Sequence, residues 1–128
     1  MSLEQALDDG CSVVGGCPYA DADPEAHLDL VVALARDRGL PLDLHLDLTD
    51  DPDASQLALV IPRIERAGLQ GRVSVGHMTA LSAMPPAALA QAIASLAGAG
   101  VAVISLPTTD LWLSGRDGRH LQLRCPAH

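Results

Sequence analysis

An alternation of strand-like and helical segments constrains the fold of this chain more than any other feature. Short apolar runs with the composition of strands occur at residues 12–15, 41–46, 72–76 and 101–105. Segments with apolar residues at intervals of three and four lie between them, at residues 26–38, 54–67 and 85–97. Because right-handed crossovers make successive strands parallel neighbours, the sequence predicts an α/β fold with four parallel β/α units.

Glycine and proline set the expected boundaries of the helices. A short helix at residues 3–7 is expected to end before Gly10, and Gly39 ends the most regular helical segment. Pro62 lies inside the next helical segment, so a kink or a break into two pieces is expected there. Nothing after Trp112 repeats the unit, and residues 114–128 are predicted to form an irregular tail of a single domain that covers residues 1–128.

Four such units occur in two architectures. A closed eight-stranded barrel typically needs about 250 residues, so length alone favours a small open sheet over half of a barrel. The run after the first strand, Gly15-Gly16-Cys17-Pro18, lacks GxGxxG spacing and leads into an acidic loop that would repel phosphate. A nucleotide-binding sheet is therefore not expected.

Composition excludes several classes of partner. The core must be aliphatic, since Tyr19 and Trp112 are the only aromatic residues, and no stacking platform for nucleic acid bases is present. The formal charge of −8 repels a phosphate backbone and an anionic membrane surface. No run approaches the roughly 20 apolar residues of a membrane span. We therefore expect neither nucleic acid nor membrane as a partner.

The cysteines indicate a reducing compartment. Cys11, Cys17 and Cys125 are odd in number, lack CxxC spacing, and come without a recognisable secretory leader. We therefore expect a cytoplasmic protein. Cys11 and Cys17 flank the first strand and are interpreted as core or strand-end thiols, because no activating partner is visible nearby.

Two histidines end successive predicted strands. His45 follows an alternating apolar strand and is flanked by carboxylates, and His77 ends the next strand. Because parallel strands bring their carboxyl ends to one edge of the sheet, two imidazoles are expected to meet there. That arrangement indicates a metal or a polar substrate. His27, His120 and His128 share no recognisable spacing with this pair and are interpreted as surface residues.

Five short runs match the pattern of one known family in order and spacing: VVGGCP at 13–18, DLHLD at 43–47, GRVSVGHMTA at 71–80, LP at 106–107 and LSGR at 113–116. By these runs the chain resembles the cytosine deaminase-like branch of the metal-dependent amidohydrolases, which are (β/α)8 barrels. The resemblance covers nearly all of the chain up to Arg116 and is most specific at the two histidine strands. It implies a partial TIM-type barrel, with the four strands as roughly the fourth to seventh.

The resemblance also implies a reaction and roles for individual residues. His45 would ligate a divalent metal, iron or zinc, and His77 would lie beside the activated water and the substrate. The inherited reaction would be hydrolytic deamination of a small nitrogen heterocycle such as cytosine. Met78 and Trp112 are candidates to line the pocket, although packing of Trp112 over an apolar edge is the alternative for that residue.

Three departures from the family pattern bear on activity. The HxH pair of the first strand and the Asp ligand of the eighth strand have no counterpart, and the chain is expected to begin after that first strand. Leu48 stands where family members have a proton-carrying Glu. Asp47, Asp50 or Asp51 would have to replace it, unless these acids simply form a solvated loop. The chain is therefore expected to be incomplete as an enzyme on its own.

Other interpretations stay open. Four strands cut from a barrel leave two edges and an uncovered inner face, predicted to be apolar, so a non-catalytic half-barrel would associate with itself. A homodimer or higher oligomer is predicted on this ground. The missing strands would otherwise come from another chain, or the sequence is a truncated or frame-disrupted fragment.

Overall fold

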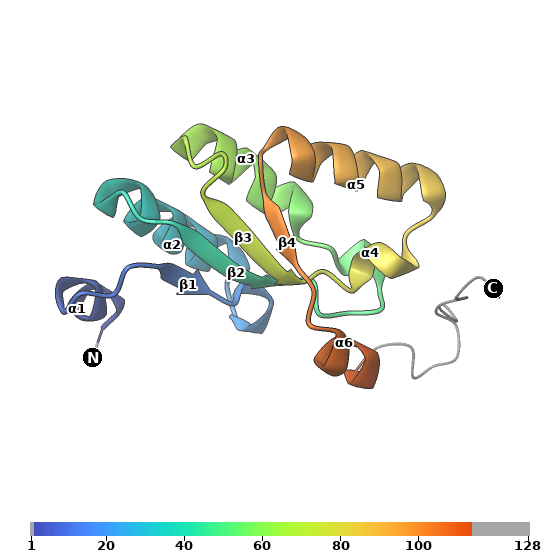
Figure 1. The fold of residues 1–128 in the computed structure, drawn as a ribbon, viewed down its shortest axis with the longest axis horizontal. Helices are drawn as coiled ribbons and strands as arrows, with labels where there is room; N and C mark the ends of the chain where they lie inside the picture. The colour runs from blue at the N-terminus through green and yellow to red at the C-terminus, as the bar shows by residue number, and fades with distance from the viewer. Residues whose placement is uncertain (1, 114–128) are drawn as a thin grey trace.

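A four-stranded parallel sheet forms the centre of the protein in a computed structural model that describes residues 2–113 (Figure 1). Each strand pairs with the next strand along the chain, in the order β1-β2-β3-β4. This order confirms the predicted α/β fold with four parallel units. The predicted irregular tail at residues 114–128 lies outside the described residues. The strands are β1 (Val14–Gly16), β2 (Leu42–Leu46), β3 (Val73–His77) and β4 (Ala102–Ile104).

The helices alternate with these strands as predicted. Two helices that the sequence did not predict follow the third and fourth strands: α4 (Ala80–Ala83) and α6 (Pro107–Leu113). The predicted helices are α1 (Leu3–Asp8), α2 (Pro24–Arg38), α3 (Leu57–Ala67) and α5 (Pro86–Gly98). Two short 3-10 turns, η1 (Pro18–Ala20) and η2 (Pro52–Ala54), precede α2 and α3.

The sequence predicted a kink or a break into two pieces at Pro62. Helix α3 runs through Pro62 without interruption, so the break is wrong. Proline removes one backbone hydrogen bond from a helix interior and crowds the preceding turn. Pro62 is exposed, while Ile61 and Ile64 on either side of it are buried against the core. Packing of the buried stripe therefore holds the helix together across the proline.

The hydrophobic core lies between the sheet and the helices that Figure 1 shows along one side of it. Alternation along β2 sends Leu42, Leu44 and Leu46 into this core, and all three are fully or almost fully buried. The side chains that contribute most from the helices are Leu28 and Val31 of α2 and Val60 and Ile64 of α3. Burial of these aliphatic groups is the main stabilising contribution to the fold.

The opposite face of the sheet differs from the sequence-based prediction. Asp43 and Ser74 lie side by side in adjacent strands, and the Ser74 hydroxyl donates to the Asp43 carboxylate over 2.5 Å. His45 follows Asp43 on the same face. The inner face of the partial barrel is therefore polar along its two central strands, and the prediction of an apolar inner face is wrong there.

The residues of β4 are continuously apolar, a pattern typical of a buried strand. The structure instead exposes Val103 and Ile104, each by 46%. The reason is position, since β4 is an edge strand that pairs only with β3 in the described sheet. An apolar run thus indicated the strand correctly but not its burial.

The two described cysteines differ in exposure. Cys11 is exposed, which corrects its interpretation as a core or strand-end thiol, because it lies in the loop before β1; Cys17 is half-buried at the end of that strand. Cys125 lies outside the described residues. Of the helices within residues 2–113, none combines the length and apolar composition that crossing a membrane requires.

Candidate functional site

The carboxyl ends of β2 and β3 bring His45 and His77 together, as their positions in the sequence predicted. The Nδ1 atom of His45 lies 3.0 Å from Nε2 of His77, which is hydrogen-bond distance. The two ring centroids are 5.1 Å apart and the ring planes are tilted by 50°. Two imidazoles from residues 32 positions apart in the chain therefore form one unit at the edge of the sheet.

Unusual backbone conformations are concentrated at this edge. Of the described residues other than glycine, only Asp47, His77 and Met78 have positive φ angles, of 51°, 72° and 55°. Such left-handed conformations cost about 1–2 kcal/mol per residue for most side chains. Strained backbone gathers at functional sites, where the surrounding structure maintains it. This clustering supports the histidine edge as the functional one.

The left-handed conformation of His77 has a direct effect on its side chain. Strict alternation along β3 would place the His77 side chain on the face of Val75, which is buried toward the helices. The positive φ interrupts this alternation, and the imidazole lies against His45 instead. The local strain thus accompanies the contact between the two histidines.

Asp110 is a third member of the site that sequence reasoning missed. It lies on α6, which leaves the carboxyl end of β4 at the same edge (Figure 1). Its Oδ1 atom is 2.9 Å from Nδ1 of His77, and its Oδ2 atom accepts the backbone N–H of Leu106 over 3.0 Å. The His77 and Asp110 side chains are only 7% and 13% exposed. The available signal was an acidic residue in the segment after the fourth strand, six positions beyond its end at Ile104.

Asp47 does not take the place of the missing proton-carrying Glu. Its side chain accepts the Ser55 hydroxyl over 2.5 Å and the backbone N–H of Gln56 over 2.8 Å, at the start of α3. Asp47 is 2% exposed, and this burial raises the pKa of its carboxyl group. Both oxygens are therefore engaged in holding the loop after β2 to α3, away from the histidines.

His27 is more than the surface residue that the sequence indicated. Its Nε2 accepts the backbone N–H of Cys17 over 3.2 Å, and its Nδ1 lies 3.0 Å from Asp21. A Cβ atom on Gly16 would lie 2.7 Å from the same Nε2, so the ring packs directly on the end of β1. Both ring nitrogens are used inside the protein, which makes His27 a structural clamp. His120 and His128 lie outside the described residues.

The two candidate pocket residues differ in exposure. Met78 is buried in the hydrophobic core, so the expectation that it lines a pocket is wrong. Trp112 lies on α6 and is 73% exposed. Its exposure matches an aromatic ring at an apolar edge more closely than the wall of an enclosed cavity.

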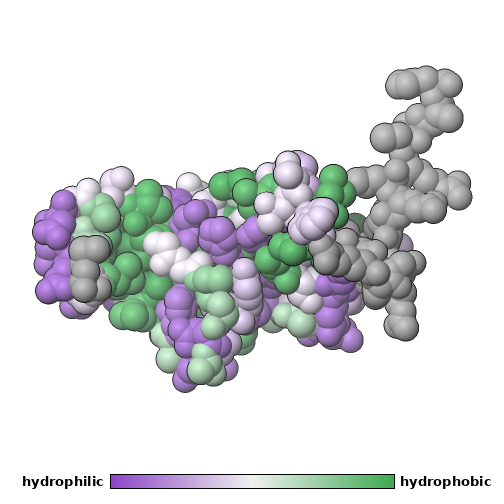
Figure 2. Space-filling view, turned by 90° about the horizontal axis from the view of Figure 1, so that it is seen from below, coloured by the Kyte–Doolittle hydropathy of each residue, from purple (hydrophilic) through white to green (hydrophobic). Residues whose placement is uncertain are grey.

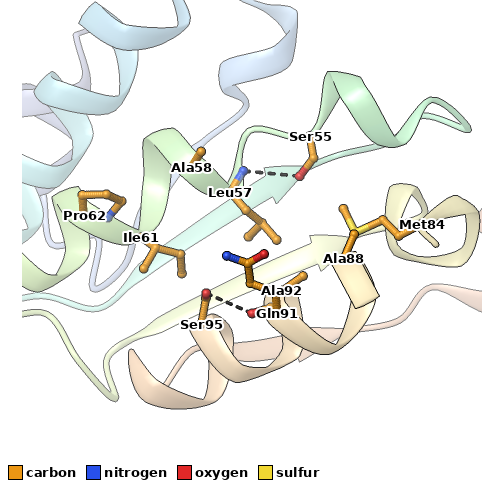
Figure 3. Close-up of a pocket in the computed structure, with 10 residues that line it drawn as sticks. All are labelled: Ser55, Leu57, Ala58, Ile61, Pro62, Met84, Ala88, Gln91, Ala92 and Ser95. Atoms are coloured by element: carbon orange, nitrogen blue, oxygen red, sulfur yellow. Dashed lines mark hydrogen bonds between the residues drawn. The ribbon is translucent and has the colours of Figure 1, made fainter. Parts of the chain in front are cut away.

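A groove of about 390 Å³ lies elsewhere, between α3 and α5 on the helical side of the sheet (Figure 3). Leu57, Ile61 and Ala92 form its apolar walls, and Met84 and Ser55 lie at one end. Neither His45 nor His77 lines it. The histidine pair therefore lies at an open rim, separate from this groove.

The donor set at the rim is a poor fit to a complete catalytic metal site. Within residues 2–113, no group of three or more His, Cys, Asp and Glu side chains is arranged to hold a metal ion. Catalytic zinc sites commonly take three protein ligands and leave one position open. His45 and His77 also use one nitrogen each to contact each other. The described residues therefore do not form a complete metal site by themselves.

Comparisons with known proteins point to one group of enzymes. No family model matches this sequence. The chain is 31% identical over 114 residues to pterin deaminase from Rhizobium rhizogenes, a match that covers 89% of this chain. It spans only 26% of the length of that relative.

Solved structures give a similar result. The fold matches 5-methylcytosine deaminase from Klebsiella pneumoniae with a TM-score of 0.80 and 26% identity, over 89% of this chain and 28% of that one. It also matches N-isopropylammelide isopropylaminohydrolase from Burkholderia multivorans with a TM-score of 0.72 and 30% identity, over 80% of this chain and 27% of that one. These matches confirm the resemblance to cytosine deaminase-like amidohydrolases and the fold of a partial TIM-type barrel.

Proposed function

We propose that this chain contributes part of the active site of a hydrolytic deaminase that acts on a small nitrogen heterocycle such as cytosine. The contact between His45 and His77 at the carboxyl edge of the sheet carries this proposal. The similar proteins support the reaction class, since two of them are deaminases and the third is an aminohydrolase. In a hydrolytic deamination, water adds to a ring carbon, its oxygen stays there, and the amino or alkylamino group leaves as ammonia or an amine.

We assign different roles to the two histidines. His45 is exposed at the rim and is the proposed ligand of a divalent metal, iron or zinc. When bound, such a metal supplies hydroxide at neutral pH by lowering the pKa of a water ligand. His77 is proposed to face the attacking water and the substrate, with its ring held by Asp110.

The remaining ligands are proposed to come from outside residues 2–113. This follows from the fit of the site, because two imidazoles fall short of the usual three protein ligands. The isolated chain is accordingly expected to show no turnover of cytosine, measured as release of ammonia. Metal-dependent turnover by the purified chain would contradict this expectation.

Metal content tests the role of His45. Because the described residues supply an incomplete ligand set, we expect sub-stoichiometric metal that depends on His45, measured by plasma mass spectrometry on protein purified without chelator and re-equilibrated with Fe²⁺ or Zn²⁺. His45→Ala should reduce the retained metal at least about tenfold, since loss of one ligand weakens a small ligand set severely. His27→Ala is the matched control, because both nitrogens of His27 are already used inside the protein. Equal metal in the wild type and His45→Ala would remove the proposed ligand role.

A second candidate function is a non-catalytic half-barrel that works as an oligomer, and the apolar edge favours it. Within residues 2–113, strand β4 pairs on one side only, with β3, and edge strands template association with other chains. Figure 2 shows that hydrophobic surface on one face of the molecule is interrupted by hydrophilic residues. The exposed apolar residues of β4 and α6 are Val103, Ile104, Leu111, Trp112 and Leu113.

Light scattering tests this association. We expect the chain to form a homodimer or larger assembly at micromolar concentration, and Ile104→Lys to shift it toward monomer, because a charge opposes burial of the β4 edge. Ile93→Lys is the matched control, since Ile93 is 53% exposed on α5, away from the strand edge. A monodisperse wild-type monomer would remove the oligomer proposal.

A further inference from the structure

We propose that Asp110 is a positioning residue that fixes the proton positions of both His77 and His45. Its contribution to metal binding rests on the proposed function, whereas its effect on the two imidazoles does not. The structural basis is a chain of hydrogen bonds from Leu106 through Asp110 and His77 to His45.

The first hydrogen bond in this series has a direction that is fixed by its atoms. The backbone N–H of Leu106 donates to Oδ2 of Asp110, because an amide nitrogen of the main chain can only donate. The second oxygen of the same carboxylate faces Nδ1 of His77. An ionised carboxylate only accepts hydrogen bonds, so His77 carries its proton on Nδ1.

The proton on Nδ1 of His77 determines the state of His45. In neutral His77 the Nε2 atom then holds a lone pair, and this atom lies 3.0 Å from Nδ1 of His45. His45 therefore donates from its own Nδ1, which leaves its Nε2 with a free lone pair. Nε2 lies on the far side of the ring from this hydrogen bond, on an exposed residue. That is the nitrogen available to a metal.

Burial protects the hydrogen bond between Asp110 and His77 from water. The Asp110 and His77 side chains are 13% and 7% exposed, so water competes little for the hydrogen bond between them. His45 at the other end of the chain of hydrogen bonds is exposed. The geometry thus places the directing carboxylate in the protein and the free lone pair at the surface, where a ligand can reach it.

The substitution Asp110→Asn gives a specific prediction. It keeps the shape of the side chain but replaces one acceptor oxygen by an NH₂ group that donates hydrogen bonds. The Asn side-chain oxygen must face the Leu106 N–H, so its NH₂ group turns toward Nδ1 of His77. His77 Nδ1 then has to accept, and its proton moves to Nε2. His77 next donates to Nδ1 of His45, and the His45 proton also moves to Nε2. Both rings should therefore change tautomer together.

Nuclear magnetic resonance tests this directly on metal-free protein labelled with ¹⁵N at histidine. Long-range ¹H–¹⁵N correlation spectra at pH 8 should show His45 and His77 protonated on Nδ1 in the wild type and on Nε2 in Asp110→Asn. His27 is an internal reference, since its Nε2 accepts the Cys17 N–H and its proton must lie on Nδ1. Single His→Gln variants assign the signals. Unchanged tautomers in Asp110→Asn, or a doubly protonated His77 in the wild type, would overturn the inference.

Asp21→Asn is the matched control, because Asp21 faces His27 in the way that Asp110 faces His77. It should leave the His45 and His77 signals unchanged, and a change in them would count against a specific role for Asp110. Zinc titration gives a second measurement, with a loss of affinity of about 10- to 100-fold expected for Asp110→Asn. If the tautomers switch but no variant or wild type binds zinc, the positioning role stands and the metal proposal fails.

Discussion

Replacing Leu44 by alanine is expected to lower the free energy of unfolding by about 3–4 kcal/mol, because truncation of a buried leucine loses hydrophobic burial and leaves a cavity. Leu44 is fully buried in β2. It pairs with Gly16 of β1 on one side and with Val75 of β3 on the other, so the backbone around it has little freedom to close the cavity. Urea denaturation followed by circular dichroism measures the change.

The same truncation at an exposed leucine shows whether the loss of stability comes from burial. Leu30→Ala removes the same atoms from α2, where the side chain is 53% exposed, and should change stability by less than about 0.5 kcal/mol. A loss at Leu44 no larger than that at Leu30 would mean that β2 is not the centre of the core. Because His45 follows Leu44 directly, Leu44→Ala is also expected to weaken metal retention by loosening the strand that carries the ligand.

The strand and helix order could be predicted because short-range patterns determine it. Apolar runs such as residues 72–76 and the glycine that ends α2 at Gly39 are local signals, and the structure places β3 and the end of α2 as these signals indicated. Parallel pairing then follows from the handedness of the crossovers. The meeting of His45 and His77 was predictable for the same reason, since both end neighbouring strands.

Other features depend on contacts that the sequence does not display. Asp110 reaches His77 only because α6 turns back at the edge of the sheet, and the sequence indicated no helix there. The exposure of Val103 depends on its position in an edge strand, which an apolar run cannot reveal. The role of His27 depends on the close approach of its ring to Gly16. Each of these is a tertiary contact, without a local period or spacing to mark it.

Asp47 gives the second large expected effect, and it tests the loop that follows the His45 strand. Asp47→Ala should lower the free energy of unfolding by about 2–3 kcal/mol, because it leaves the Gln56 N–H and the Ser55 hydroxyl without their acceptor. Alanine also tolerates the left-handed φ of 51° less well than Asp or Asn does. Asp47→Asn should be close to neutral at pH 7, since its oxygen can accept from Gln56 and its NH₂ group can donate to Ser55.

The pH dependence of the stability of the wild type and of Asp47→Asn separates the effect of hydrogen bonding from the effect of charge. Burial raises the pKa of Asp47 above its ordinary value of 3.8, so the folded state favours the protonated carboxyl group. The stabilisation from that proton is complete below pH 3.8 and is lost as the pH rises through the folded-state pKa. The stability of Asp47→Asn relative to wild type should therefore increase across this window and then level off. Denaturation curves measured for both proteins from pH 3 to pH 8 give the difference directly, and a difference that falls with rising pH would show that the folded protein prefers the carboxylate.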